Sequence, residues 1–464
     1  MSGTFHVHTF GCQMNVHDSD RMSETLEAHG WRSEADADRA DVIILNTCSV
    51  RDKAEQKLRS ELGRLAALKR AKRDLVLVVA GCVAQQEGDR LLAREPALDL
   101  VIGPDNIAEL PVLLAGAMGG APPHARAEFD IDLPRFLEAR PEAGKTPISA
   151  FVTTMKGCDE RCSFCIVPYT RGPERYRPAV DIIDECQRFV AAGAREIVLL
   201  GQTVDSFRDP ALPLPNVDPD ADADETQFPE LLRRIARDVP GLLRLRYTSP
   251  HPRHATASLA RAHAELDVLA RHVHLPVQSG SDAVLRRMIR RYTRAEYIER
   301  AERLKGAREG LTLSTDFIVG FPGETDEDFE ATLSLAREVG FVSLFAFKYS
   351  PRPFTPALKL KGEIPEDVKA ARLAALLALG DELTARNLAS LVGTTQRVLV
   401  RGQGKHPGHL EGRTEANEIV HVVGPAHLVG SMVDVHVTRS FKHSLEAELG
   451  KGKRTLPLWA ASAH

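Results

Sequence analysis

The chain has 464 residues, 43% of them hydrophobic and 27% charged, which is ordinary for a folded globular protein and suggests about three domains. The formal net charge is −4, so overall charge gives no support for nucleic-acid binding, and any such surface must be local. The longest strongly apolar run, residues 75–83, is too short for a transmembrane helix, and residues 1–12 show no signal-peptide pattern. We therefore expect a cytoplasmic protein with no membrane partner.

The seven cysteines are an odd number in a chain with no visible export signal. Metal binding or catalysis is therefore a better interpretation of them than a disulfide framework. Six of the seven fall into two groups of three, which are Cys12, Cys48 and Cys82, and Cys158, Cys162 and Cys165.

Residues 1–120 alternate between short apolar runs and helical patterns. The runs are residues 5–9, 42–46, 75–80 and 98–102. Continuous apolar runs with helices between them predict an open α/β unit whose parallel sheet is buried on both faces. Residues 121–147 are rich in Gly, Pro, Ala and Glu without a clear period, and we predict a linker there.

From residue 148 to residue 390 the alternation resumes with longer helices. The strand candidates are residues 150–154, 196–200, 242–248, 272–277, 312–319 and 343–349, and a long helix is expected over 365–392. Six βα units predict a partial (β/α)6 barrel of parallel strands. The acidic, proline-rich stretch 208–225 is predicted to be a surface loop.

Residues 391–458 have a different character. Short β-branched runs at 396–400, 418–423 and 432–438 are separated by glycine-rich turns, which predicts a small antiparallel β-barrel. From Leu391 to His464 there are nine basic and six acidic residues, so this end is mildly basic while the whole chain is acidic.

The strongest chemical signal is the spacing C-x3-C-x2-C of Cys158, Cys162 and Cys165, just after a predicted strand. Three thiolates on one loop can hold three irons of a 4Fe–4S cluster and leave the fourth iron open to a substrate or cofactor. A structural zinc site is the alternative, but it needs a fourth ligand. Cys186 could supply one, yet it shares a helical face with apolar neighbours, so we predict it to be a core residue.

The other three cysteines each follow a predicted parallel strand of the N-terminal unit. They are Cys12, Cys48 and Cys82. The carboxyl ends of such strands converge on one crevice, where ligands bind. A single cysteine there is better explained as a buried structural residue, but three at equivalent positions favour a second open 4Fe–4S cluster.

Polar and glycine motifs follow three strands of the predicted barrel, at the ends where barrels place active sites. Each motif alone is usually only a turn, but together they predict a pocket for a small-molecule cofactor. The predicted cofactor-binding residues are Gly201, Gln202, Gln278, Ser279, Gly320 and Glu324.

A dense run of arginines lies on a predicted helix between residues 286 and 294. A solvated helix face explains such a run, and contact with a phosphate backbone is the alternative. Lys348, Arg352 and basic residues near the C-terminus could extend the surface. The candidate RNA-binding residues are Arg286, Arg290, Arg291 and Arg413.

Taken together, these motifs resemble the radical S-adenosylmethionine methylthiotransferases, and the C-terminal part resembles a TRAM domain, a small RNA-binding barrel. The resemblance covers nearly the whole chain and is closest to the branch acting on isopentenyladenosine in tRNA. The stretches that carry it are Thr9-Phe-Gly-Cys-Gln-Met-Asn15, Asn46-Thr-Cys-Ser-Val-Arg51, Gly81-Cys-Val-Ala-Gln85, Ile166-Val-Pro-Tyr-Thr-Arg-Gly172, His274-Leu-Pro-Val-Gln-Ser-Gly-Ser281, Asp316-Phe-Ile-Val-Gly-Phe-Pro-Gly-Glu324 and Tyr349-Ser-Pro-Arg352.

The resemblance implies two 4Fe–4S clusters and S-adenosylmethionine as cofactors. It implies that reductive cleavage of S-adenosylmethionine at the cluster of Cys158, Cys162 and Cys165 gives a radical, which removes hydrogen from C2 of the isopentenylated adenine. Sulfur then arrives through the second cluster, and a methyl group completes the methylthio group. The implied partners are the tRNA anticodon loop, an electron donor such as flavodoxin or ferredoxin, and a sulfur or cluster donor.

Four residues depart from the family pattern: Tyr176, Thr203, Asp205 and Ala416. These departures put local substrate or cofactor contacts in doubt, but not the reaction. Three rival readings stay open. One is a methylthiotransferase acting on threonylcarbamoyl-adenosine in tRNA or on a ribosomal-protein aspartate. The others are an iron–sulfur RNA-binding module without turnover, and a zinc protein.

Overall fold

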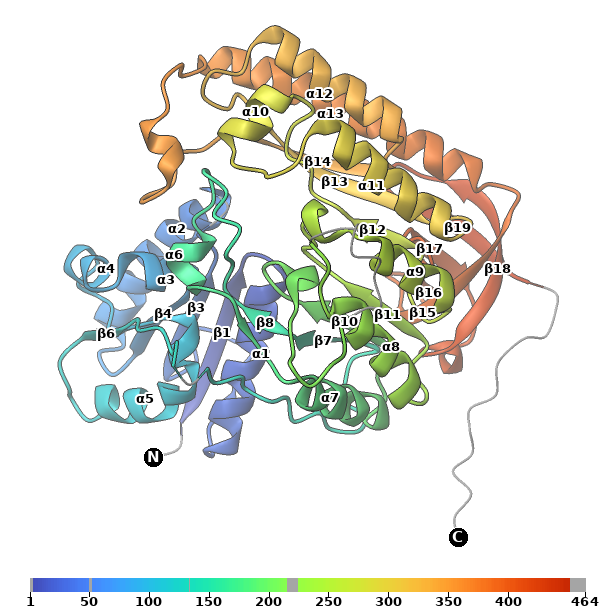
Figure 1. Cartoon of the computed structure of the whole chain (residues 1–464). Coiled ribbons are helices and arrows are strands. Elements are labelled where there is room, and N and C mark those ends of the chain that lie inside the picture. Colours follow the sequence, from blue (N-terminus) through green and yellow to red (C-terminus); the bar gives the residue numbers. More distant parts are fainter. Residues whose placement is uncertain (1–2, 50–51, 133, 215–223, 451–464) are drawn as a thin grey trace.

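Figure 1 shows the computed structural model, which describes residues 3–49, 52–132, 134–214 and 224–450. The chain forms an N-terminal α/β unit, a central βα unit and a C-terminal barrel, in sequence order. Part of the predicted loop 208–225 and the end of the predicted barrel segment, 451–458, lie outside the described residues. Within the described part of the chain, no helix is both long and apolar enough to cross a membrane.

The N-terminal unit is built on one parallel sheet, as the apolar runs predict. Its strand order is β2-β1-β3-β4-β5-β6. The strands are β1 (Thr4–Phe10), β2 (Arg32–Ser33), β3 (Val42–Thr47), β4 (Val76–Gly81), β5 (Leu100–Ile102) and β6 (His124–Arg126). The linker prediction for 121–147 is wrong at its start, because β6 pairs with β5 and extends the sheet at its edge.

Helices cover both faces of this sheet. Val42 and Ile44 of β3 face the core under α1 (Gln13–Ala28) and α5 (Leu110–Met118). Ile43 and Leu45 face the opposite core under α2 (Asp52–Ala71), α3 (Cys82–Glu87) and α4 (Asp89–Arg94). The alternation has the period of two expected of a strand buried on both sides, and it explains the continuous apolar runs. A 3-10 helix, η1 (Pro104–Glu109), precedes α5.

The central unit contains the six expected strands, in two parallel sheets of three. One sheet has the order β11-β10-β7, with β7 (Ser149–Thr153), β10 (Glu196–Leu200) and β11 (Arg244–Tyr247). The other has the order β12-β13-β14, with β12 (His272–His274), β13 (Thr312–Val319) and β14 (Ser343–Lys348). A parallel bridge between Leu245 and Leu269 joins the two sheets, so they form one partial barrel.

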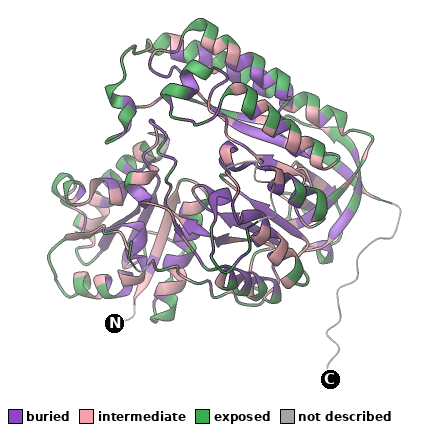
Figure 2. Ribbon diagram, in the orientation of Figure 1, coloured by how far each residue is buried: buried purple, intermediate pink, exposed green. Residues whose placement is uncertain are grey.

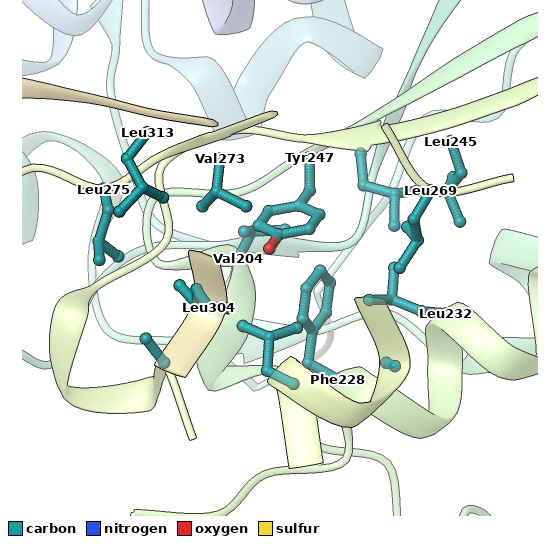
Figure 3. Close-up of a cluster of buried hydrophobic side chains, with 14 of the residues drawn as sticks. Val204, Phe228, Leu232, Leu245, Tyr247, Leu269, Val273, Leu275, Leu304 and Leu313 are labelled. Carbon is teal, nitrogen blue, oxygen red and sulfur yellow. The ribbon is translucent and has the colours of Figure 1, made fainter. Parts of the chain in front are cut away.

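The barrel helices pack on the outside of these sheets and share one core with them. Figure 2 shows buried strands beneath helices whose outer faces are exposed. Figure 3 shows part of this core, where Phe228 of α8 lies against Tyr247 of β11. The helices are α6 (Val167–Arg171), α7 (Ala179–Ala191), η2 (Val204–Ser206), α8 (Phe228–Asp238), η3 (Pro252–His254), α9 (Ala257–Glu265), α10 (Asp282–Arg287), α11 (Arg294–Ala307), α12 (Asp326–Val339), η4 (Pro356–Lys359) and α13 (Glu366–Ser390). The prediction that Cys186 belongs to the core is confirmed, because it is fully buried in the apolar cluster under α7.

The C-terminal unit is a closed five-stranded barrel with the order β15-β16-β17-β19-β18. Its elements are β15 (Thr395–Gln403), β16 (His409–Thr414), β17 (Ile419–Val423), η5 (Ala426–Leu428), β18 (Met432–Ser440) and β19 (Ser444–Leu449). The expectation of a wholly antiparallel barrel is wrong in one place, since β17 and β19 pair parallel to close it. Arg244 and Arg246 of β11 donate to the carbonyl oxygens of Arg413 and Thr414 at 3.0 and 3.2 Å, which fixes this barrel to the central unit.

Helix α13 is attached to the central barrel by a buried ion pair. Arg372 Nη1 lies 2.7 Å from Glu324 Oε2, and both side chains are buried. We expect Arg372→Ala to lower the free energy of unfolding by about 3–5 kcal/mol, because it leaves a buried carboxylate without its partner. Arg386→Ala is the matched control on the same helix, since its pair with Glu382 is exposed and should cost only about 0.3–0.5 kcal/mol. Urea titration measures both; equal costs would contradict the prediction.

Candidate active site

A short loop after the first barrel strand holds the central cysteines. The two-residue strands β8 (Met155–Lys156) and β9 (Arg175–Tyr176) pair antiparallel on either side of this loop. Gly157 opens the loop with φ +80°, and a Cβ there would lie 1.9 Å from the carbonyl oxygen of Pro173. Glycine is therefore required for the chain to fold back so closely before Cys158.

The loop is hydrogen-bonded to the ends of the neighbouring barrel strands. The backbone N–H of Gly157 donates to Gln202 Oε1 at 2.6 Å, and Thr203 Oγ1 lies 3.0 Å from Cys158 Sγ. On the other side, the backbone N–H of Ser163 donates to the carbonyl oxygen of Met288 at 2.9 Å. The central thiols thus lie at the carboxyl ends of the strands, where barrels place active sites.

Thiols that share one small, largely desolvated region fit a cationic metal group. Burial raises the pKa of Cys158 well above its usual range, and the neighbouring Cys165 and Cys162 raise it further. Burial, followed by the charge of Cys162, raises the pKa of Cys165 to about 12. Cys162 is buried, and Cys158 and Cys165 are half-buried. Three adjacent thiolates need positive charge between them, and iron supplies it, so this donor set suits an iron–sulfur cluster.

The N-terminal cysteines follow three neighbouring strands of the first sheet, and the structure brings them together. Cys12 follows β1, Cys48 follows β3 and Cys82 begins α3 directly after β4. The hydrogen bond with Cys48 is the main cause that lowers the pKa of Cys12 to about 6, and Cys82 is close enough to feel the charge of Cys12. A Cβ on Gly11 would lie 2.8 Å from Cys48 Cβ, so the thiol-bearing turns pack tightly.

The two cysteine groups face each other across the junction of the first two units. Cys82 acts electrostatically on Cys165. Arg171 of α6, from the central unit, is buried there: its Nε donates to Cys82 Sγ at 3.3 Å and its Nη2 to Asp18 Oδ2 at 2.6 Å. Sequence reasoning missed Arg171 as a site residue, although it lies inside the quoted stretch 166–172.

The predicted cofactor residues fall into two groups. Gly201, Gln202 and Gln278 adjoin the strand ends, and Gln278 is half-exposed with φ +76°. Ser279 is fully buried with its hydroxyl 3.4 Å from Thr332 of α12.

Two further predicted cofactor residues bind each other. The backbone N–H of Gly320 donates to Glu324 Oε2 at 2.6 Å, and the same carboxylate holds Arg372. Since Glu324 is buried and already paired, it serves first to attach this loop to α13. Its role toward a cofactor stays a prediction, as does that of Gly320.

The predicted basic helix is interrupted. α10 ends at Arg287 and α11 begins at Arg294, with Ile289 at φ +57° between them. Arg286 and Arg291 are exposed, but Arg290 is buried and its Nη1 donates to Cys162 Sγ at 3.3 Å. The expectation that Arg290 lies on an RNA-binding surface is therefore wrong, because its guanidinium points inward to the cysteine loop.

Two other basic candidates are also engaged by the protein. Arg352 is buried, and its Nη1 lies 3.1 Å from Glu55 Oε1 of α2, so it joins the first two units. Arg413 is half-buried, and its Nη1 donates to the carbonyl oxygen of Asn417 at 2.8 Å.

A cavity of about 620 Å³ lies where all three units meet. Cys12 and Gln13 border it from the N-terminal unit, and the hairpin between β16 and β17 borders it from the C-terminal barrel. Its polar lining includes Arg246, His272, His274, Asp316 and Arg413, and its apolar lining includes Phe345, Phe347 and Leu377. The space is large enough for a nucleobase with a substituent.

The four departures from the family pattern lie around these features. The hydroxyl of Tyr176 donates to Glu174, and Thr203 contacts Cys158. Asp205 is fully buried, accepts from the backbone N–H of His251 at 2.8 Å, and has its pKa raised to about 7 by burial. Ala416 borders the cavity.

No group of three or more His, Cys, Asp or Glu side chains in the described ranges is arranged to hold a metal ion. Each iron of a cluster takes one thiolate, so cluster ligands need not converge on one point.

The glycine before the first central cysteine gives a direct test of the loop. We expect Gly157→Ala to lower the iron bound at the central site several-fold, because the methyl group meets the Pro173 carbonyl. Gly193→Ala is the control, since Gly193 also has positive φ but no atom of the described residues lies within 4 Å of a Cβ there. Iron content is measured in chains that lack the N-terminal cysteines, and equal loading of the two variants would contradict the account.

Three family models match the chain. Residues 4–103 match an uncharacterized protein family, UPF0004, residues 152–336 match the radical SAM superfamily, and residues 389–449 match the TRAM domain. The radical SAM match implies S-adenosylmethionine and one 4Fe–4S cluster as cofactors.

Curated relatives are similar over nearly the full length. A tRNA-2-methylthio-N(6)-dimethylallyladenosine synthase from Sorangium cellulosum is 61% identical, covering 97% of this chain and 94% of the relative. Proteins with the same name from Anaeromyxobacter dehalogenans and Geobacter sulfurreducens are 47% and 46% identical, each covering 96% of this chain and 94% and 97% of the relative.

Among solved structures, the radical S-adenosylmethionine methyltransferase TsrM from Kitasatospora setae, with cobalamin and a [4Fe–4S] cluster bound, matches with a TM-score of 0.54. It is 16% identical and covers 77% of each chain, so this likeness concerns the fold alone.

Proposed function

Since the chain belongs to the family of tRNA-2-methylthio-N(6)-dimethylallyladenosine synthases, we propose that it replaces the C2 hydrogen of N6-isopentenyladenosine, beside the anticodon of tRNA, with a methylthio group. Two cysteine groups lie close enough for Cys82 to act on Cys165, and this is the observation that carries the proposal. Cys12 of the N-terminal group borders a cavity that the RNA-binding type of barrel also borders.

Cys158, Cys162 and Cys165 would hold the 4Fe–4S cluster that acts with S-adenosylmethionine. Two hydrogen bonds fix the geometry of this loop. Gln202 accepts one from the backbone N–H of Gly157, and Arg290 donates the other to Cys162 Sγ. When bound, the cluster and S-adenosylmethionine supply the radical chemistry that an unactivated aromatic C–H bond requires. Gly201, Gln202, Gln278, Ser279, Gly320 and Glu324 stay our predictions for the cofactor pocket.

Cys12, Cys48 and Cys82 would hold a second 4Fe–4S cluster, which is the site of sulfur delivery in this proposal. Two observations support it: the three thiols lie at the ends of adjacent parallel strands, and Cys12 borders the cavity. Thiolates are the form that binds iron, and the lowered pKa of Cys12, caused first by its hydrogen bond with Cys48, suits that form.

The cavity is our proposed pocket for the modified base. Phe345 and Phe347 are 55% and 40% exposed and, with Leu377, give it an apolar side that suits the isopentenyl group. Arg246 and Arg413 also line the cavity, and we propose that they face the negatively charged backbone or the adenine ring edge. The walls orient the base and exclude water, which protects a reactive intermediate.

The C-terminal barrel, with Arg413, and the exposed Arg286 and Arg291 are our proposed contacts to the anticodon loop. A splayed base from a single-stranded loop can enter a pocket of this kind. The reaction also needs electrons and sulfur, so we propose an electron donor such as flavodoxin or ferredoxin, and a sulfur or cluster donor. Residues 1–120, 148–390 and 391–458 are the proposed domains for sulfur delivery, radical chemistry and RNA binding.

The test uses the full chain with both sites loaded with iron and sulfide, a reductant and S-adenosylmethionine. We expect 2-methylthio-N6-isopentenyladenosine only from tRNA that carries N6-isopentenyladenosine. Methylthiolation of threonylcarbamoyl-adenosine or of a ribosomal-protein aspartate instead would overturn the proposed substrate. Absence of 5′-deoxyadenosine under all conditions would support an RNA-binding module without turnover.

A further inference from the structure

Each cysteine group has one buried arginine that donates a hydrogen bond to a thiol sulfur. Arg290 Nη1 lies 3.3 Å from Cys162 Sγ, and Arg171 Nε lies 3.3 Å from Cys82 Sγ. Each arginine side chain is only 5% exposed. Burial of a guanidinium is costly unless its charge and its N–H groups have partners. The presence of one buried arginine at each cysteine group therefore calls for a functional explanation.

The two arginines differ in the charge around them. Arg171 donates to Asp18 Oδ2 at 2.6 Å, so a buried carboxylate largely balances its charge. The other partners of Arg290 are neutral: the carbonyl oxygen of Pro276 at 2.7 Å and the hydroxyl of Tyr292 at 2.7 Å. No carboxylate of the described residues lies within ion-pair distance of Arg290, so its full positive charge faces the Cys162 sulfur.

A positive hydrogen-bond donor at a cluster sulfur stabilises the reduced form, which carries more negative charge. Reduction potentials of iron–sulfur clusters depend on net charge and on hydrogen bonds to the sulfurs. Low effective dielectric at a buried site strengthens the effect.

We propose that Arg290 and Arg171 are positioning residues that separately set the reduction potentials of the two clusters. Arg290 raises the potential of the central cluster. Arg171 raises the potential of the N-terminal cluster by a smaller amount, because Asp18 partly offsets its charge. This inference rests on the proposed function only for the presence of the two clusters. The unbalanced charge of Arg290 makes the central cluster, which must accept an electron from the donor, easier to reduce.

Two full-length backgrounds separate the clusters. One carries Cys158→Ala, Cys162→Ala and Cys165→Ala and keeps only the N-terminal site. The other carries Cys12→Ala, Cys48→Ala and Cys82→Ala and keeps only the central site. The midpoint potential of each remaining cluster is measured by electron paramagnetic resonance during titration with dithionite.

The expected result is a crossed pattern. Arg290→Gln shifts the central potential to more negative values and leaves the N-terminal potential unchanged. Arg171→Gln shifts the N-terminal potential to more negative values, by a smaller amount, and leaves the central potential unchanged. Arg290→Lys keeps the charge and should fall between Arg290→Gln and the parent. Arg286→Gln, which changes an exposed arginine near the same loop, should shift neither potential.

Asp18→Asn gives an independent sign test. Removing the carboxylate leaves Arg171 unbalanced beside Cys82, so the N-terminal potential should shift to more positive values. Potentials that are the same in the arginine variants and the parents, or a negative shift in Asp18→Asn, would overturn the inference. If the background that keeps only Cys12, Cys48 and Cys82 binds no iron, the second cluster of the proposed function is overturned, and so is the inferred role of Arg171. The inferred role of Arg290 is still decided by the background that keeps only the central site.

Discussion

Cys158→Ala should abolish the release of 5′-deoxyadenosine from S-adenosylmethionine. Cys158 is the first thiol of the central loop and is held at 3.0 Å from Thr203 Oγ1. With one of the three proposed ligands gone, the loop should not hold an intact cluster, and without a cluster S-adenosylmethionine would receive no electron. The measurement is chromatography of 5′-deoxyadenosine after incubation with dithionite, with an expected fall to background.

Cys186→Ala is the control for that variant. Cys186 is also a buried thiol of the central unit, but it lies in the apolar core under α7. Its replacement should cost about 1 kcal/mol of stability, as removal of a small buried group does, and leave iron content and cleavage intact. If Cys186→Ala lost the central cluster while Cys158→Ala kept it, the ligand assignment would be wrong.

Cys48→Ala should separate cleavage from sulfur insertion. Cys48 lies in the N-terminal unit at the end of β3 and is not part of the central loop, so 5′-deoxyadenosine should still form. Methylthiolated product should fall to background, because the N-terminal site loses one of its three thiols. Mass spectrometry of the digested tRNA measures the product.

Two outcomes would contradict this prediction. Normal methylthiolated product from Cys48→Ala would mean that the N-terminal cysteines do not deliver sulfur. Loss of 5′-deoxyadenosine as well would mean that the two sites depend on each other, which the contact of Arg171 with Cys82 would then have to explain.

Much of this architecture could be predicted from local sequence patterns. The strand patterns predict ten parallel strands, four in the N-terminal unit and six in the central unit. The clearest of them, such as Val42–Thr47 and Val76–Gly81, are almost continuously apolar because they are buried on both faces. The edge strand β6 was not predicted, for the opposite reason. Its three residues, His124–Arg126, are only half-buried, so it carries no apolar signal. The parallel closure of the small barrel by β17 and β19 depends on contacts distant in sequence, which no local pattern contains.

The candidate site shows the same division. Cysteine spacing and strand ends predict which thiols meet, since parallel strands end at one edge. The inward direction of the Arg290 side chain could not be predicted. Ile289 has a left-handed φ of +57°, so the helical spacing that would place Arg290 beside Arg286 on an exposed face does not continue through it. The role of Arg171 depends on how the first two units pack, which the spacing of residues within either unit does not reveal.

The central claim is tested most directly by mass spectrometry of tRNA nucleosides from cells that lack this gene. We predict accumulation of N6-isopentenyladenosine and loss of its 2-methylthio form, with restoration by the intact gene and not by one carrying Cys158→Ala. An unchanged nucleoside profile in the deletion strain would contradict the claim that this chain methylthiolates tRNA.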